Sequence, residues 1–315
     1  MESPLIKPSS LRPGDTIGIA APASPFDQEA FEAGVGVLEA MGFTVKIPDK
    51  LFKREGYLAG SDAERAALLM DLFGDKTVRA IFCARGGFGS MRLLPLLDLE
   101  KIGRQPKIVV GFSDVTALLI TLFKKCGLLT FHGPMVSTLG KGSERTSSAL
   151  MAAVSTHSPL VLTPSRPVVL SPGHASGPVI GGNLTTLSHL MGTPFEPAFE
   201  GHLLFLEDRG EAPYRIDRML SQFRLGGCLD RVAGVILGSF EHCGPLEEVY
   251  DIVKRIFQER PVPVLAGFDI GHGTDNMTLP LGLHADLDTE DGFLRFKEPA
   301  VIEGDPCTTP SHSFL

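Results

Sequence analysis

The sequence places a serine at a sharp turn between an apolar run and an apolar helical pattern. Ile108, Val109 and Val110 form a run typical of a buried strand, and Ser113 lies three residues after it. Apolar residues then return at helical spacing, so the turn joins a strand to a helix. A hydroxyl at such a turn projects from the sheet edge, and the first helical amides point at the group that it attacks. The pattern indicates a nucleophile, with helix capping as the alternative role of this serine.

Two further strand ends carry the groups that an activated serine needs. The apolar run 203–206 leads directly into Glu207, and His272 lies between two glycines after another apolar run. A serine needs an imidazole to accept its proton, and the imidazole needs a carboxylate that holds its tautomer and stabilises its charged form. Ser113, Glu207 and His272 therefore form a predicted catalytic triad.

Each partner has a competitor. His132 also follows a strand-like run and is the strongest alternative base. Asp208 could replace Glu207, or it could cap a neighbouring turn. Cys83 is a conceivable nucleophile, but it lies within an apolar strand and is predicted to be a core residue.

A glycine-rich loop at 85–90 follows another apolar run. Its spacing matches neither G-x-G-x-x-G nor a Walker motif, which argues against a phosphate-binding loop. Glycines also allow close approach of the backbone to a substrate. We expect the amides of Gly87 and Asp114 to form an oxyanion hole, with a simple tight turn as the alternative.

Strand-like and helix-like segments alternate through the first half of the chain. One helix has an apolar face at Phe31, Val35 and Leu38, and another begins at a capping box of Ser61 and Glu64. Strands are predicted at 15–22, 43–47, 80–83, 107–110 and 128–131. This alternation predicts an α/β fold with a parallel sheet flanked by helices and functional loops at the carboxyl ends of the strands.

The second half alternates in the same way but ends differently. Strands are predicted at 179–180, 203–206, 232–237 and 264–268, and helices at 214–224 and 246–258. A strand-like segment at 294–296 follows an Asp291-Gly292 turn and indicates an antiparallel pair. The second half is therefore predicted to be another α/β unit with a mixed sheet.

The composition between the two halves changes, with Gly, Pro, Ser and Thr dense around 140–177. We expect a nucleophile-bearing domain at 1–145, a linker region at 146–176 and a domain that supplies the acid and the base at 177–315. The active site would lie at the interface between the two domains.

The composition excludes several classes of partner. The chain has 315 residues, 43% of them apolar, with 29 Lys and Arg against 37 Asp and Glu. A net charge of −8 without basic runs argues against nucleic acid and anionic membranes. The start shows no secretory pattern, and no apolar run is long enough to span a membrane. Five scattered cysteines (83, 126, 228, 243 and 307) are typical of reduced thiols in a cytoplasmic protein and give zinc binding no support.

Taken together, these motifs resemble the LD-carboxypeptidase family of serine peptidases, which also contains the microcin-immunity hydrolases. The matching segments are 14–22, 84–90, 111–114, 131–134, 181–184, 205–208 and 271–272, with Asn276. Phe112 stands where tyrosine is frequent in the family. The resemblance implies Ser113 as nucleophile, Glu207 as orienting acid and His272 as base, and it favours the amides of Gly87 and Asp114 as the oxyanion hole.

The resemblance also implies an activity. The usual reaction of the family removes the terminal D-alanine from the tetrapeptide of recycled murein, without a metal or organic cofactor, and a homodimer is expected. An exopeptidase must recognise a free carboxylate, for which Arg85 and Arg209 are the candidates beside the catalytic loops. Two alternatives remain: an immunity-type hydrolase that cleaves peptidyl or aminoacyl adenylates, and a non-catalytic metabolite-binding protein. The absence of tryptophan and the presence of only three tyrosines disfavour an adenylate, which would benefit from an aromatic stacking platform.

Overall fold

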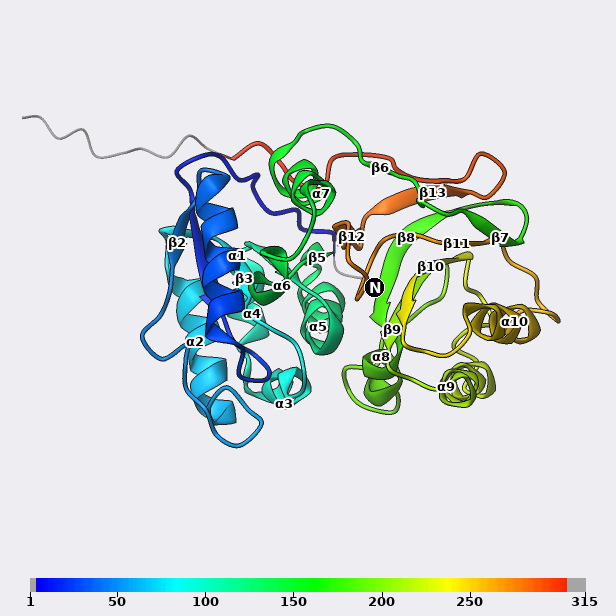
Figure 1. Cartoon of the computed structure of the whole chain (residues 1–315), viewed down its shortest axis with the longest axis horizontal. Helices are drawn as coiled ribbons and strands as arrows, with labels where there is room; N and C mark the ends of the chain where they lie inside the picture. The colour runs from blue at the N-terminus through cyan, green and yellow to red at the C-terminus, as the bar shows by residue number, and fades with distance from the viewer. Residues whose placement is uncertain (1–3, 305–315) are drawn as a thin grey trace, which may run out of the picture.

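Two β-sheets organise the computed structural model, which describes residues 4–304 (Figure 1). The first has the order β12-β5-β4-β3-β1-β2 and is parallel except for β12. Its strands are β1 (Thr16–Ala20), β2 (Thr44–Lys46), β3 (Val78–Cys83), β4 (Ile108–Gly111), β5 (Thr130–His132) and β12 (Leu279–Leu281). The parallel sheet that alternation predicted is therefore confirmed.

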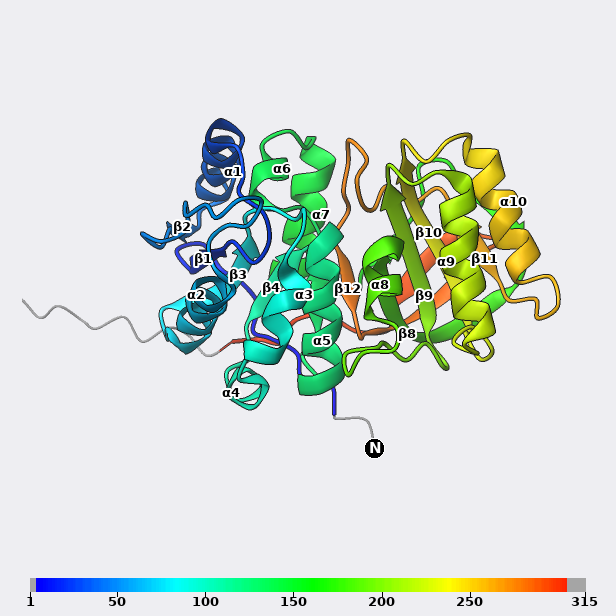
Figure 2. The same cartoon turned by 90° about the horizontal axis from the view of Figure 1, so that it is seen from below.

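Helices lie on both faces of this sheet. Figure 2 shows α1 and α6 on one side of the strands and α2 and α5 on the other. The helical segments are α1 (Gln28–Ala40), α2 (Asp62–Gly74), α3 (Ser90–Leu93), η1 (Leu94–Leu96), α4 (Leu99–Arg104), η2 (Ser113–Val115), α5 (Thr116–Cys126) and α6 (Val136–Leu139). The capping box of Ser61 and Glu64 begins α2 as expected. All of β4 and most of α5 are buried, because their side chains are mainly apolar.

The second sheet is mixed, as expected, in the order β6-β14-β13-β8-β9-β10-β11-β7. Strands β8 to β11 are parallel, and the remaining pairs are antiparallel. Its strands are β6 (Val161–Leu162), β7 (Val168–Ser171), β8 (His174–Asn183), β9 (Leu203–Arg209), β10 (Gly234–Glu241), β11 (Val264–Ala266), β13 (His284–Asp288) and β14 (Phe293–Phe296). Helices α8 (Leu184–Leu190), α9 (Pro213–Leu225) and α10 (Leu246–Ile256) pack along it. The pair predicted around 291–296 is the β13–β14 hairpin.

The chain passes between the two sheets more than once. Helix α7 (Glu144–Ser155) precedes β6 and β7, which lie in the predicted linker region but pair with the second sheet. Strand β12, late in the chain, returns to the first sheet and pairs with β5. The loop that joins β11 to β12 therefore crosses from one sheet to the other. The exact domain boundaries stay a prediction.

Contacts between the halves bring two sets of strand ends together. Helix α5 packs against both α8 and β8 (Figures 1 and 2). At this seam the backbone N–H of Asn183, the last residue of β8, donates to Thr116 Oγ1 at the start of α5 (3.1 Å). The carboxyl ends of β4 and β8 thus meet, and loops at these ends are the usual position of a site in an α/β protein.

Two other expectations concern the chain as a whole. The four cysteines among residues 4–304 are free thiols, and Cys307 lies outside the described residues. Within the same residues, every helix is too short or too polar to cross a membrane.

Candidate active site

Ser113 has an unusual backbone conformation. Its φ is 62°, in the left-handed region that residues other than glycine rarely adopt, and the only other such case among the described residues is His242. The residue lies two positions after the end of β4 and begins the short η2 turn before α5. No hydrogen bond from its side chain caps η2 or α5, so the capping alternative has no support. This strained, half-buried hydroxyl at a strand-to-helix turn has the geometry of a nucleophile elbow.

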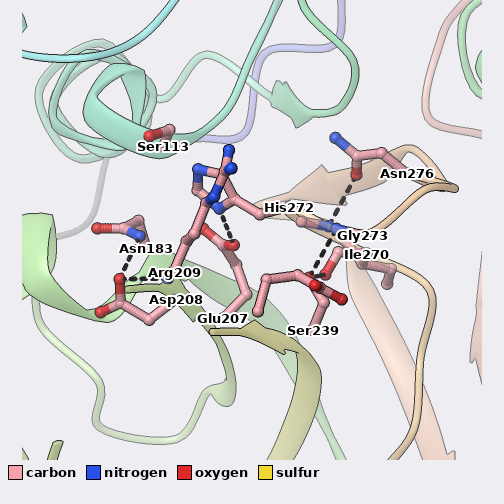
Figure 3. Close-up of polar contacts among 12 residues, drawn as sticks. Ser113, Asn183, Glu207, Asp208, Arg209, Ser239, Ile270, His272, Gly273 and Asn276 are labelled. Carbon is pink, nitrogen blue, oxygen red and sulfur yellow. Dashed lines mark hydrogen bonds and ion pairs between the residues drawn. The ribbon is translucent and has the colours of Figure 1, made fainter. Parts of the chain in front are cut away.

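His272 and Glu207 form a close pair on the facing side (Figure 3). His272 Nδ1 lies 2.7 Å from Glu207 Oε2, and the acid is completely buried while the histidine side chain is 13% exposed. No hydrogen bond joins Ser113 to His272, but the neighbouring Phe112 ring lies 4.9 Å from the His272 ring in an edge contact. The His272 ring therefore lies between the Glu207 carboxylate and the turn that carries Ser113. Such hydrogen bonds are often long in free enzymes and tighten when substrate binds.

The loop that carries His272 is held by backbone hydrogen bonds on both sides of the ring. Gly271 N–H donates to Asn276 Oδ1 (2.9 Å), and Gly273 N–H donates to Ser239 Oγ (3.2 Å). Gly271 has a φ of 116°, and a Cβ at this position would lie 2.5 Å from Glu207 Oε2. Only glycine fits here, because a side chain would displace the carboxylate that orients His272. Sequence reasoning gave Ser239 no role, and nothing in its immediate sequence marks it.

Asp208 points to the opposite side of β9 from Glu207, since successive strand residues alternate. Its carboxylate accepts from Asn183 Nδ2 (2.9 Å), from Thr185 N–H and Oγ1 (2.9 and 2.8 Å) and from Arg209 N–H (2.8 Å). Asp208 thus binds the amino end of α8, while Glu207 contacts His272. Burial and the charge of Glu207 raise the pKa of Asp208 to about 6.

The glycine-rich loop lies against Ser113. A Cβ on Gly86 would lie 3.1 Å from Ser113 Cβ and 3.3 Å from its Oγ. Asp114 Oδ2 accepts the Ser90 N–H (2.8 Å), which ties the end of the loop to the nucleophile turn. No protein hydrogen bond among the described residues uses the N–H of Gly87 or of Asp114. Both amides are thus available to an oxyanion, although that role stays a prediction.

A buried arginine that sequence reasoning missed supports this loop. Arg65 of α2 is 3% exposed and pairs with Asp62. Its guanidinium also donates to the backbone oxygens of Pro22 and Gly89, after β1 and β3 respectively. The side chain therefore fastens two of the loops that border the site. Its position on a helix, three residues after an acid, looks like an ordinary surface pair in the sequence.

Arg85 and Arg209 are both exposed beside these loops. Arg85 Nη1 donates to Pro25 O (2.7 Å), and neither guanidinium pairs with a carboxylate among residues 4–304. Arg209 lies two residues after Glu207 on β9 and points to the same side (Figure 3). Two uncompensated positive charges thus border the site of a chain whose net charge is −8.

The remaining competitors are fully buried. His132 lies at the end of β5 with its ring 4.9 Å from the Phe205 ring and 5.8 Å from the Phe112 ring. It cannot reach a substrate as a base, because the ring is 0% exposed. Cys83 is also 0% exposed, and burial raises the pKa of its thiol to about 12, so it is a core residue as expected.

The sequence and the fold match known proteins over almost their full length. Residues 17–133 match the LD-carboxypeptidase N-terminal domain and residues 176–287 the LD-carboxypeptidase C-terminal domain. A probable murein peptide carboxypeptidase of Bacillus subtilis (strain 168) is 38% identical over 311 residues, which cover 94% of each protein. The muramoyltetrapeptide carboxypeptidase from Oxalobacter formigenes is 30% identical with a TM-score of 0.78, over 89% of this chain and 97% of that one. Microcin C7 self immunity protein MccF, solved with aspartyl sulfamoyl adenosine, is 28% identical with a TM-score of 0.88, over 94% of this chain and 100% of that one.

Proposed function

The chain belongs to the LD-carboxypeptidase family, and we propose that it is a serine carboxypeptidase that releases the terminal D-alanine from murein tetrapeptides in cell-wall recycling. The observation that carries this proposal is the 2.7 Å pair between Glu207 and His272, which faces a serine held at a φ of 62°. An orienting acid, an imidazole and a strained serine are the parts that acyl transfer requires.

The proposed reaction begins when His272 takes the proton of Ser113. Ser113 Oγ then attacks the carbonyl carbon that joins the L-centre of a diamino acid to D-alanine. The amides of Gly87 and Asp114 donate to the oxyanion, a contribution on the order of 10²–10³-fold for one donor. His272 protonates the departing amine, and a water molecule that His272 deprotonates hydrolyses the acyl-enzyme.

Recognition of the free carboxylate of D-alanine is assigned to Arg85 and Arg209. Both guanidinium groups are exposed beside the catalytic loops and lack an acidic partner among the described residues. A guanidinium can bind a carboxylate through two parallel hydrogen bonds, which would select substrates with a free terminus. The family resemblance also predicts a homodimer, which analytical ultracentrifugation of the purified chain would test.

The test measures D-alanine released from a murein tetrapeptide by the wild type and by Ser113→Ala. We expect a loss of kcat on the order of 10⁴-fold or more, because the variant lacks the nucleophile. Ser221→Ala is the matched control, since this serine lies on the outer helix α9 and its hydroxyl contacts Asp217. It should retain wild-type turnover. Equal activity of the Ser113 variant and the wild type would refute the proposal.

The main alternative is hydrolysis of peptidyl or aminoacyl adenylates, as in microcin detoxification. The similarity to MccF at a TM-score of 0.88 favours it, whereas the 38% identity to a carboxypeptidase favours the murein peptide. An aminoacyl-adenylate analogue assayed beside the tetrapeptide separates the two by nucleotide release. A fluorophosphonate probe tests the non-catalytic alternative: we expect an adduct on Ser113 that is absent in His272→Ala. A protein that hydrolyses neither substrate and never reacts with the probe would be a binding protein.

A further inference from the structure

His132 lies behind the proposed catalytic pair with no hydrogen-bond partner. The residue is 0% exposed, and neither Nδ1 nor Nε2 is paired. A neutral imidazole always carries one N–H, so a buried donor is left without an acceptor. Buried polar groups in native proteins are almost always paired, because an unpaired one loses its hydrogen bond to water without replacement.

Glu207 has an unpaired acceptor that could receive this N–H. Its Oε2 binds His272, but its Oε1 is buried and has no partner. A carboxylate in a fully buried position needs donors on both oxygens, since desolvation of the charge is costly. Oε1 of Glu207 is therefore an unpaired acceptor.

The fold places His132 against the face of β9 that carries Glu207, since its ring lies 4.9 Å from the ring of Phe205, two residues before the acid. His132 ends β5, where it pairs with Gly111 of β4 and Leu279 of β12. Two titratable groups act on its ring, Glu207 from β9 and His272 from the loop between β11 and β12. The aromatic neighbours, from the β4–η2 junction and from β9, are uncharged.

Two further unpaired polar atoms come from the loop between β11 and β12, which crosses between the halves. Thr278 Oγ1 and Asn276 Nδ2 are buried without partners. A Cβ on Gly133, the residue after His132, would lie 2.8 Å from Thr278 Oγ1, so this hydroxyl adjoins the histidine backbone. A group of unpaired buried polar atoms of this kind is a suitable site for an ordered water, which typically makes about three hydrogen bonds to such atoms.

We propose that His132 is a positioning residue: its ring N–H donates through one bridging water to Glu207 Oε1, and so keeps Oε2 on His272. The inference rests on the proposed function, because the pair that it orients is the proposed acid and base. It assigns the first domain a part in orienting an acid of the second. Burial lowers the pKa of His132 to about 4, which keeps the ring neutral at neutral pH and leaves it one N–H to donate.

The test compares H132F with H132Q by release of D-alanine from a murein tetrapeptide. Phenylalanine keeps an aromatic ring between Phe112 and Phe205 but removes the donor, whereas glutamine restores an N–H. A hydrogen bond to a charged group contributes about 1.5–3 kcal/mol, so kcat of H132F should fall about 10- to 150-fold. KM should change little, since His132 is buried away from substrate. H132Q should recover most of the loss.

A matched control separates positioning from packing. His202 is another buried histidine, 5% exposed, whose Nδ1 contacts Glu200 O at 2.7 Å and whose ring lies 6.4 Å from the Phe123 ring. H202F should lower thermal stability without lowering kcat. Wild-type kcat in H132F would overturn the inference, and so would equal losses in H132F and H132Q.

A measurement on the wild type tests the inference even if the His132 variants do not fold. In protein labelled with ¹⁵N-histidine, the ring N–H proton of His132 should give a low-field signal protected from exchange, which shifts in E207Q. A rapidly exchanging proton would refute the link between His132 and Glu207. This arm does not depend on turnover, so it still decides the inference if the wild type releases no D-alanine and the proposed function fails.

Discussion

Replacement of His132 by phenylalanine should change how stability depends on pH. Burial lowers the pKa of His132 from 6.5 to about 4 in the folded protein, whereas the unfolded chain keeps the ordinary value. Between these values the unfolded state binds a proton that the folded state does not, so stability falls as pH falls through this window. A shift of this size corresponds to about 3 kcal/mol between pH 7 and pH 4, at about 1.4 kcal/mol per pH unit.

Asp208 opposes this effect in nearly the same window. Its pKa rises from 3.8 to about 6 on folding, so the folded state binds the extra proton and its contribution to stability falls as pH rises from about 4 to 6. The two contributions largely cancel in the wild type. H132F removes one of them, and its stability should therefore increase, relative to the wild type, as pH falls from 7 to 4.5.

Urea unfolding followed by circular dichroism at pH 7, 5.5 and 4.5 measures this difference. The free energy of unfolding of H132F minus that of the wild type should rise by about 2–3 kcal/mol over the range. F205L is the control, because it alters packing on the His132 ring (4.9 Å away) but keeps the imidazole. The free energy of unfolding of F205L should be lower than that of the wild type by the same amount at each pH. A pH-independent difference between H132F and the wild type would refute the reasoning.

Three other substitutions test the site. Gly271→Ala should lower kcat about 10²-fold, since its Cβ would lie 2.5 Å from Glu207 Oε2 and a 1 Å misplacement has an effect of that order; unchanged D-alanine release would contradict the assigned orientation. Thr116→Val removes the hydroxyl that accepts a backbone N–H across the domain seam, so turnover should fall several-fold while circular dichroism shows both halves folded. Gly87→Ala places a Cβ 2.5 Å from Ser24 Oγ at a φ of 106°, and it should lower kcat with little change in melting temperature if the amide serves the oxyanion.

Local patterns in the sequence predicted much of the fold. Continuous apolar runs correspond to β3, β4 and β9, and the capping box marks the start of α2, because these elements depend on neighbouring residues. The turn at Ser113 was predictable for the same reason. Strand β12 was not, since a three-residue segment after a long loop carries no periodicity that separates it from coil.

The sequence alone determined which residue types could perform the chemistry: a serine at a strand-to-helix turn, an acid and a histidine after other strands. The residue pattern left Glu207 and Asp208 open, and only the tertiary structure shows which of them contacts His272, because adjacent strand residues face opposite sides and the register of β9 selects Glu207. It also showed that His132 is fully buried, a position from which it cannot reach a substrate. Glu207 and His272, 65 positions apart, and His132 and Leu279, 147 positions apart, come together through strand pairing and contacts between the halves, and no local pattern encodes these contacts.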